Sequence, residues 1–252
     1  MNLFKKPKAG DKNLILAKTH DFVKDGPEVL TAVFIHGIAS DSGSFTNALK
    51  YLEGTTSLKN VRFVTFDLLG AGKSTKSEEL NYDYRDQITA LHNAISELEL
   101  KTPLVIVGHS MGTLIATRYA DTYKKSVKKL ILISPPVYRP EDLEMPAFRA
   151  NMAAFKKAVA AKEHAYAHDK AFQMEIDKIV MNRYNYGRLA ELKTKATLIY
   201  SEADEIIAPF NVRRVVKQNP KYLNSIVTIG THRVARDKYS KIPALLEEVI
   251  NG

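Results

Sequence analysis

The amino-acid sequence predicts a doubly wound α/β fold built on a mostly parallel sheet. The first observation is a series of short, nearly continuous apolar runs rich in Val, Ile and Phe, a composition typical of strands buried on both faces. The second is that helical patterns separate these runs, as parallel strands require. The third is size: 252 residues that are 45% hydrophobic are enough for one sizeable core, and α/β chains of this length commonly form one domain.

Seven apolar runs are the expected strands. In chain order they span residues 13–18, 31–37, 61–67, 103–110, 127–134, 196–201 and 225–230. The carboxyl ends of parallel strands meet at one edge of a sheet, so the loops that follow these runs are expected to lie close together.

Helical periodicity is clearest in the segment YRDQITALHNAISELEL. Its residues Ile88, Leu91, Ile95 and Leu98 recur at helical spacing, which places them on one face of a helix. Further segments that suit helices span residues 111–125, 211–218 and 242–251.

One interval interrupts the alternation of strands and helices. From Pro135 to about Leu192 there is no candidate strand. The interval opens with PPVYRPEDLEMP, whose prolines disfavour a regular helix, and continues with a segment rich in Ala, Lys, Glu and Met, which favour one. We therefore expect a core domain formed by residues 1–134 and 193–252, with residues 135–192 inserted as a helical unit at one edge of the sheet crevice.

Composition excludes several classes of protein. The chain has no cysteine, which excludes disulfides, thiolate metal sites and a cysteine nucleophile. No run approaches the ~18 apolar residues of a membrane span, and no apolar stretch follows the basic start MNLFKKPKAG, so we expect a cytoplasmic protein without a membrane span. The formal net charge is +9, but 37 Lys and Arg are interleaved with 28 acidic residues, which favours a solvated basic surface over a nucleic-acid partner. The sequence does not determine the oligomeric state.

The segment VIVGHSMGT carries the strongest indication of chemistry. It places Ser110 in the pattern G-x-S-x-G, between a candidate strand and a candidate helix. Gly108 and Gly112 supply the small neighbours that a sharp strand-to-helix turn needs, and this turn lifts the serine hydroxyl out of the sheet. It also points the amino terminus of the next helix at the reacting atoms, where negative charge develops. This context favours a nucleophile over an ordinary serine in a glycine-rich turn.

A serine nucleophile needs a base, and the base needs an acid to orient it. Of the seven histidines, His232 follows the last candidate strand, where it can meet a residue that follows the Ser110 strand. The loop SEADEIIAP follows the preceding strand and contains Asp204, 28 residues before His232 (232 − 204). We therefore predict that Asp204 orients His232, with Glu202 and Glu205 as alternatives for the acid.

Acyl transfer also needs backbone donors for the oxyanion. The segment FIHGIAS follows the second candidate strand, and its Gly37 lets the backbone bend over the site, so that the N–H of Ile38 faces the developing charge. The N–H of Met111, immediately after the nucleophile, is the second expected donor. The alternative is a plain glycine turn at the end of a strand.

A further segment, FDLLGAGKST, ends like a nucleotide-binding P-loop. A P-loop has a glycine five positions before the Gly of Gly-Lys-Ser, but that position, counted back from Gly72, is Asp67. A P-loop also runs directly into a helix, whereas the following TKSEELNYDY is polar and turn-like. We therefore predict that Lys73 binds no nucleotide phosphate.

Five of these segments together resemble the α/β-hydrolase superfamily, in its group of small capped esterases and related hydrolases. They are HGIAS, FDLLGAGKS, GHSMGT, SEADEIIAP and GTHRVARDK, in the order and spacing of that family over nearly the whole chain. The resemblance implies an α/β-hydrolase fold and a helical cap at residues 135–192. One departure is Thr113, where many relatives have another glycine. It adds a β-branched side chain behind the turn, and we expect no contact with the catalytic triad.

The resemblance also implies a role for FDLLGAGKST. In the family that it resembles, this loop is a structural crossing beside the active site. Gly70 and Gly72 would allow tight bends, and Asp67 and Ser74 would cap exposed backbone groups.

The expected reaction is hydrolysis of a small to medium carboxylic ester through an acyl–Ser110 intermediate, without a metal or an organic cofactor. Epoxide hydrolases and haloalkane dehalogenases of this superfamily use a carboxylate nucleophile, so Ser at position 110 excludes them. Alternatives are a C–C bond hydrolase, lactonase, thioesterase or perhydrolase, or a ligand-sensing protein with slow turnover. The candidate substrate-binding residues, which alternatively pack the cap onto the core, are Phe148, Met152, Phe155, Tyr166, Phe172 and Met181.

Overall fold

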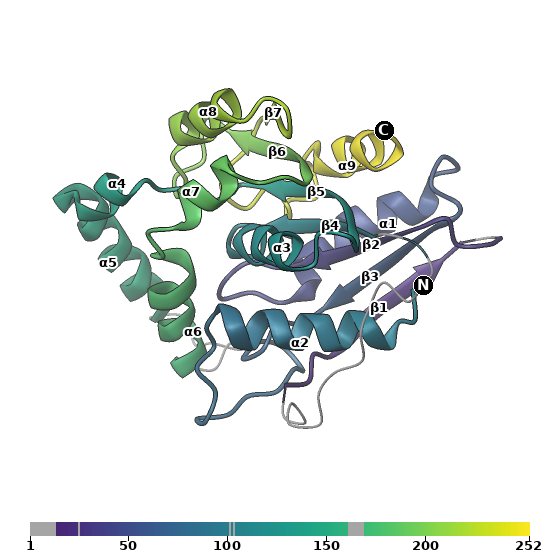
Figure 1. The fold of residues 1–252 in the computed structure, drawn as a ribbon, viewed down its shortest axis with the longest axis horizontal. Coiled ribbons are helices and arrows are strands. Elements are labelled where there is room, and N and C mark those ends of the chain that lie inside the picture. Colours follow the sequence, from purple (N-terminus) through teal and green to yellow (C-terminus); the bar gives the residue numbers. More distant parts are fainter. Residues whose placement is uncertain (1–13, 25, 101, 103, 161–168) are drawn as a thin grey trace.

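A computed structural model of the chain describes residues 14–24, 26–100, 102, 104–160 and 169–252 (Figure 1). Within these ranges one seven-stranded sheet has the order β1-β3-β2-β4-β5-β6-β7. The strands are β1 (Lys18–Val23), β2 (Leu30–Ile35), β3 (Val61–Phe66), β4 (Leu104–His109), β5 (Val127–Ile133), β6 (Lys195–Ser201) and β7 (Leu223–Thr228). β1 runs antiparallel to β3, and every other neighbouring pair is parallel. The predicted mostly parallel sheet is therefore confirmed.

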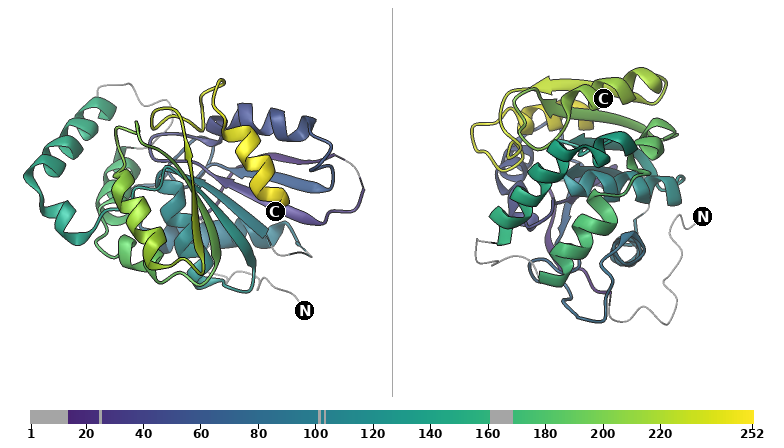
Figure 2. Two further views of the ribbon diagram at one scale, coloured as in Figure 1. Left: turned by 90° about the horizontal axis from the view of Figure 1, so that it is seen from above. Right: turned by 90° about the vertical axis from the view of Figure 1, so that its left-hand side faces the viewer.

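Helices cover both faces of this sheet, as Figure 2 shows. They are α1 (Thr46–Gly54), preceded by the short helix η1 (Ser42–Phe45), α2 (Tyr84–Glu97), α3 (Met111–Thr122), α8 (Pro209–Gln218) and α9 (Ile242–Asn251). α1 and α9 pack on one face, and α2, α3 and α8 pack on the other. The adjacent residues Val33 and Phe34 of β2 are both fully buried, one in each of the two apolar cores. Burial on both faces explains why the strands read as continuous apolar runs.

The first predicted strand is wrong in position. Most of the run NLILAK precedes β1, and its main chain pairs with the loop after β3. The carbonyl of Ala17 accepts from the N–H of Asp67 (3.0 Å), and the N–H of Ala17 donates to Oγ of Ser74 (2.8 Å). The actual edge strand is KTHDFV, which is half-exposed and has no continuous apolar run to reveal it.

Helix α1 is a second element that the sequence does not predict. Only Ala48, Leu49 and Leu52 of its nine residues are buried. That apolar stripe is too narrow to stand out in a segment that also contains turn-forming residues.

Between β5 and β6 the described residues form helices joined by short irregular segments, and none of them forms a strand. Its segments are α4 (Pro140–Glu144), α5 (Pro146–Ala160), α6 (Asp169–Glu175), the π-helical turn η2 (Ile176–Val180) and α7 (Asn185–Ala190). α4, α5 and α6 lie at the left-hand end of Figure 1. α6 meets the core closely: a Cβ on Gly70, in the loop after β3, would lie 2.3 Å from that of Ala171. In the described part of the chain, no helix has both the length and the apolar character to cross a membrane.

Candidate active site

Ser110 lies at a sharp turn between β4 and α3. Its φ of 51° and ψ of −124° belong to a region that non-glycine residues rarely adopt. The turn closes because its neighbours lack side chains: a Cβ on Gly108 would lie 2.6 Å from the carbonyl oxygen of Gly112, and one on Gly112 would lie 2.2 Å from that of Ile35. The serine thus leaves the sheet at its carboxyl edge and stands at the amino end of α3.

The loop after β7 brings His232 to Ser110. Oγ of Ser110 lies 2.8 Å from Nε2 of His232, and Nδ1 of His232 lies 3.0 Å from each carboxylate oxygen of Asp204, which follows β6. An ionised carboxylate only accepts hydrogen bonds, so Nδ1–H donates to Asp204 and Nε2 is left to accept from the serine hydroxyl. The structure therefore brings the three residues together in one chain of hydrogen bonds.

The Asp204 carboxylate is fully buried and held by its own loop. Its Oδ1 accepts from the backbone N–H of Ile206 (2.9 Å) and of Ile207 (3.2 Å). Burial alone would raise the pKa of Asp204, but the hydrogen bond and charge of His232 and the two N–H groups outweigh it and lower the pKa below its usual value. Asp204 is consequently ionised at neutral pH and fit to stabilise a positive imidazole.

The glycine loop after β2 lies against the nucleophile. A Cβ on Gly37 would lie 3.0 Å from Cβ of Ser110. His36 fixes this loop, because its Nε2 accepts from the N–H of Leu68 (2.8 Å) and its Nδ1–H donates to the carbonyl of Gly37 (2.8 Å). Burial lowers the pKa of His36, so the ring stays neutral and keeps one donor and one acceptor.

The two predicted oxyanion donors adjoin these turns. Ile38 follows Gly37 and is half-buried, and Met111 is the buried first residue of α3. The first N–H groups of a helix have no carbonyl partner within it, which leaves the N–H of Met111 available to a substrate oxygen. The role of both donors stays a prediction.

The segment FDLLGAGKST forms an irregular series of turns after β3. The Asp67 carboxylate accepts from the backbone N–H of Ser42 (3.0 Å) and of Lys73 (2.9 Å). A Cβ on Gly72 would lie 2.0 Å from Oδ2 of Asp67, so the glycine makes room for this cap. Burial favours a higher pKa for Asp67, but these backbone bonds lower the pKa below its usual value. The Lys73 side chain is exposed, and its expected indifference to nucleotides stays a prediction.

Most of the predicted substrate-binding residues lie where the insertion meets the core. Met152 and Phe172 are buried, and the half-buried Phe148, Phe155 and Met181 pack against the same apolar core as α2 and α3. This position is also what the packing alternative requires, so a substrate-binding role stays a prediction. The sixth, Tyr166, lies outside the described residues.

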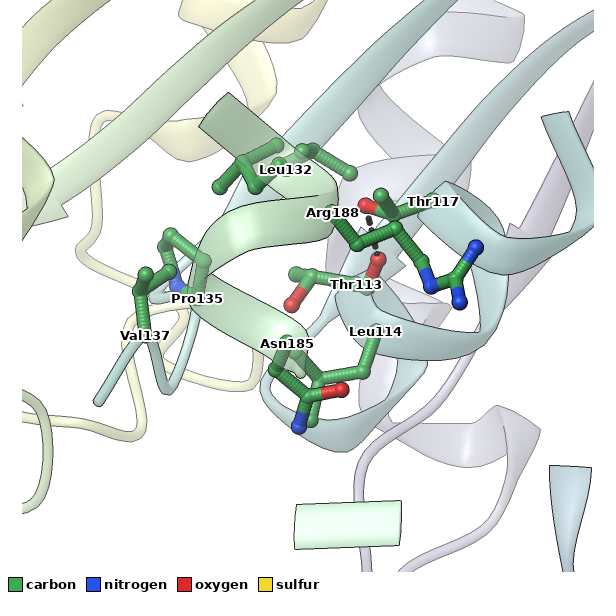
Figure 3. Close-up of a pocket in the computed structure, with 9 residues that line it drawn as sticks. Thr113, Leu114, Thr117, Leu132, Pro135, Val137, Asn185 and Arg188 are labelled. Atoms are coloured by element: carbon green, nitrogen blue, oxygen red, sulfur yellow. Dashed lines mark hydrogen bonds between the residues drawn. The ribbon is translucent and has the colours of Figure 1, made fainter. Parts of the chain in front are cut away.

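A small cavity lies beside the first turns of α3 (Figure 3). Its volume of about 10 Å³ suits a single water and not a substrate. Its lining residues are Thr113, Leu114, Thr117, Leu132, Pro135, Val137, Asn185, Arg188 and Leu189. The hydroxyl of Thr113 donates to the carbonyl of Ser110 (2.6 Å), and that of Thr117 donates to the carbonyl of Thr113 (2.8 Å). The expectation that Thr113 makes no contact with the triad is therefore wrong, because its hydroxyl bonds back to the main chain of Ser110, three residues earlier.

The two alternative acids have other partners. Glu202 pairs with Arg213 of α8. Oε2 of Glu205 accepts from the backbone N–H of His232 (3.0 Å), and Nε2–H of His109 donates to the carbonyl of the same residue (2.9 Å). Neither contact is predicted from the sequence, because a hydrogen bond to main chain leaves no pattern of residue types.

One protein family and several known proteins are similar to this chain. The family described as alpha/beta hydrolase fold matches residues 33–169, more than half of the chain. A probable lysophospholipase of Arabidopsis thaliana, BODYGUARD 5, is 33% identical over 111 residues, which cover 44% of this chain and 25% of that protein. Lipase 1 of Psychrobacter immobilis is 24% identical over 220 residues, which cover 75% of this chain and 67% of the lipase.

The fold has close counterparts among solved structures. That of a hydrolase from Oleispira antarctica matches with a TM-score of 0.74 at 15% identity, over 98% of this chain and 100% of the other. By contrast, the chain spans only about a quarter of the length of the plant relative that it matches. The matched family, the sheet order and the serine turn agree, and the chain belongs to the α/β-hydrolase fold family.

Proposed function

We propose that this protein is a serine hydrolase that cleaves small to medium carboxylic esters through an acyl-enzyme intermediate. The observation that carries the proposal is the hydrogen-bonded chain from Ser110 through His232 to Asp204, with contacts of 2.8 and 3.0 Å. Each residue follows a different parallel strand at the same edge of the sheet. A serine, an imidazole and an ionised carboxylate in this order are equipped for attack on a carbonyl carbon.

In the first half of the reaction, Oγ of Ser110 attacks the ester carbonyl while Nε2 of His232 takes the hydroxyl proton. The carbonyl oxygen gains negative charge, which the N–H groups of Ile38 and Met111 and the amino end of α3 stabilise. His232 then gives its proton to the leaving alcohol, and the acyl group remains on Ser110.

In the second half, His232 takes a proton from water, and the resulting hydroxide attacks the acyl carbon. Collapse of this second tetrahedral intermediate breaks the bond to Ser110, which recovers its proton from His232 as the acid leaves. Asp204 keeps the imidazole in the required tautomer and stabilises its positive form in both halves.

Residues 135–192 act in this proposal as a cap that binds the acyl chain. Two contacts support the placement: α6 meets the loop after β3 at Gly70, and the hydroxyl of Tyr138 donates to the carbonyl of Ile206 beside Asp204 (2.8 Å). The apolar side chains of the insertion favour an uncharged substrate with a short to medium chain. Relatives named as a lysophospholipase and a lipase support the ester bond as the target, although the plant protein is much longer than this chain.

The test combines covalent labelling with substrate turnover. A fluorophosphonate is expected to add one covalent mass to the wild type and none to Ser110→Ala. A panel of p-nitrophenyl esters of increasing acyl length is expected to be hydrolysed by the wild type only. Labelling of another residue, or full esterase activity in Ser110→Ala, would refute the mechanism.

A third outcome tests the competence of the nucleophile separately from the class of substrate. If the phosphonate labels Ser110 but no ester turns over, the nucleophile is competent and the ester assignment is wrong. Thioester, lactone, C–C bond and perhydrolysis substrates then become the next panel, and a slow single turnover would indicate a ligand sensor.

A further inference from the structure

The backbone of His232 is held on both sides by side chains that the proposed mechanism does not use. Nε2 of His109 lies 2.9 Å from the carbonyl oxygen of His232, and Oε2 of Glu205 lies 3.0 Å from its backbone nitrogen. His109 comes from the end of β4, next to the nucleophile, and Glu205 comes from the loop that carries Asp204. The main chain of His232 is therefore hydrogen-bonded to the residue before Ser110 and to the residue after Asp204.

A neutral His109 ring donates to this carbonyl when its hydrogen is on Nε2. Burial and, secondarily, the nearby His232 lower the pKa of His109 to about 3, so the ring stays neutral in any mildly acidic, neutral or basic solution. The centroids of the two imidazole rings are 5.3 Å apart, so His109 also forms part of the wall beside the base.

The loop that carries His232 has little regular structure of its own. It follows the edge strand β7, begins with Ile229, whose side chain is 80% exposed, and continues with Gly230 at a φ of 138°. Further along, Arg236 donates to Oγ of Ser40 (2.9 Å). Such a loop needs fixed points if the imidazole is to keep its 2.8 Å contact with the nucleophile.

We propose that His109 and Glu205 are positioning residues that clamp the backbone of His232 and so set the approach of its imidazole to Ser110. The inference rests on the proposed hydrolase function. His109 provides the stronger hold, because it is less exposed than Glu205 and its loss leaves a carbonyl without its donor. Glu205 provides the weaker hold, because solvent screens its exposed charge.

Paired variants separate the hydrogen bonds from the volume of the side chains. His109→Phe keeps a ring without a donor, whereas His109→Gln keeps an N–H group the same number of bonds from the backbone. Glu205→Ala removes the acceptor, whereas Glu205→Gln keeps an amide oxygen. Glu202→Ala is the matched control, because Glu202 lies on the same loop and pairs with Arg213 instead of the His232 backbone.

Ester hydrolysis is expected to show a loss of kcat with little change in KM. kcat is expected to fall about 100-fold in His109→Phe, since a small misplacement of a catalytic group costs this much, and about tenfold in Glu205→Ala. His109→Gln and Glu205→Gln are expected to recover most of the loss, and Glu202→Ala is expected to match the wild type.

Hydrogen exchange measured by mass spectrometry supplies a readout that does not depend on turnover. Exchange across residues 229–236 is expected to rise in His109→Phe and Glu205→Ala and to stay at the wild-type level in the two conservative variants. A wild type without turnover or phosphonate labelling would defeat the proposed function, and the exchange pattern would still decide the clamp. The inference would be overturned if His109→Phe and Glu205→Ala kept the exchange and the kcat of the wild type. It would also be overturned if the two conservative variants were as impaired as these two.

Discussion

At the scale of single residues, the reactivity of each member of the proposed triad depends on the other two. The three are Ser110, His232 and Asp204. The serine hydroxyl is a weak nucleophile until His232 takes its proton, and His232 faces it with the correct nitrogen because Asp204 binds the other one. The strained φ of Ser110 has the same origin, since it is what aims the hydroxyl at the base.

This dependence predicts strongly non-additive mutations. Ser110→Ala and His232→Ala are each expected to lower kcat on an activated ester by about 10⁴-fold to 10⁶-fold, and the double variant is expected to lose no more than either single one. Initial rates at saturating ester measure the effect. Independent contributions from the two residues would instead multiply, and a double variant far below both singles would contradict a triad.

At the scale of elements, close backbone contacts require glycine at positions 108 and 112 of the nucleophile turn. Gly112→Ala would push a Cβ to 2.2 Å from the carbonyl oxygen of Ile35, and neither main chain can yield. The free energy of unfolding is expected to fall by about 3 kcal/mol or more. Gly187→Ala in α7 is the control: nothing lies within 4 Å of its added Cβ, so helix propensity should raise that energy by up to about 1 kcal/mol. Urea titrations measure both, and equal midpoints would contradict the steric argument.

α6 joins the core through a buried carboxyl group. Nε2 of Gln87 donates to Oε1 of Glu175 (2.9 Å) and to the carbonyl of Leu69 (3.2 Å), so one amide links α6, α2 and the loop after β3. Burial raises the pKa of Glu175 well above its usual 4.5. The folded protein therefore keeps a proton that the unfolded chain releases, and the free energy of unfolding falls as pH rises above 4.5 towards the folded-state pKa.

The corresponding variant is expected to remove this loss of stability. Glu175→Gln does not titrate and keeps an oxygen for Gln87, so its Tm should exceed that of the wild type at about pH 8, and the difference should vanish near about pH 4. At this chain length each kcal/mol corresponds to about 2–4 °C. Asp177→Asn is the control, because Asp177 lies two residues further on, is exposed and pairs with Lys156 instead of Gln87. Parallel melting curves for wild type and Glu175→Gln at all pH values would contradict a protonated, buried Glu175.

The burial of an element decides whether it can be predicted from the sequence. β2, with both Val33 and Phe34 buried, reads as a continuous apolar run and is predicted. β1 at the edge of the sheet is missed, because its half-exposed residues have no such run and its place depends on pairing with β3, far along the chain. α1 is missed because few of its side chains are buried.

At the scale of the whole molecule, the order of the motifs predicts more of the site than any local pattern does. Parallel strands carry Ser110, Asp204 and His232 to one edge, so chain order alone brings the three together. The contacts of His109 and Glu205 with backbone atoms are not predictable, because they depend on how a loop turns and not on the types of its residues. The placement of the insertion depends in the same way on side chains of α2 and α6 meeting across the fold.

Part of the positive charge of the molecule is a cluster of lysines at the amino ends of the strands, opposite the end of the sheet where Ser110 lies. Lys193, Lys195 and Lys221 place their Nζ atoms 5.7, 5.8 and 5.3 Å from the ring centroid of Tyr222. These three lysines precede or begin β6 and β7, at the amino ends of parallel strands, whereas Ser110 follows the carboxyl end of β4. In the described part of the chain, none of the three has an ion pair with a carboxylate.

A polyanion is therefore expected to bind at this edge without reaching the proposed catalytic site. A short DNA duplex should bind without sequence preference at about 50 mM salt and be released by about 200 mM, because the attraction comes from counterion release alone. Fluorescence anisotropy measures the binding, and ester hydrolysis in the same solutions should keep the rate seen without DNA. Replacing the three lysines around Tyr222 by glutamine should flatten the salt dependence, whereas the same loss of charge at Lys50, Lys76 and Lys238, which are exposed elsewhere, should change it less. Sequence-selective binding that survives about 200 mM salt, or inhibition of hydrolysis by the duplex, would contradict a solvated basic surface remote from the site.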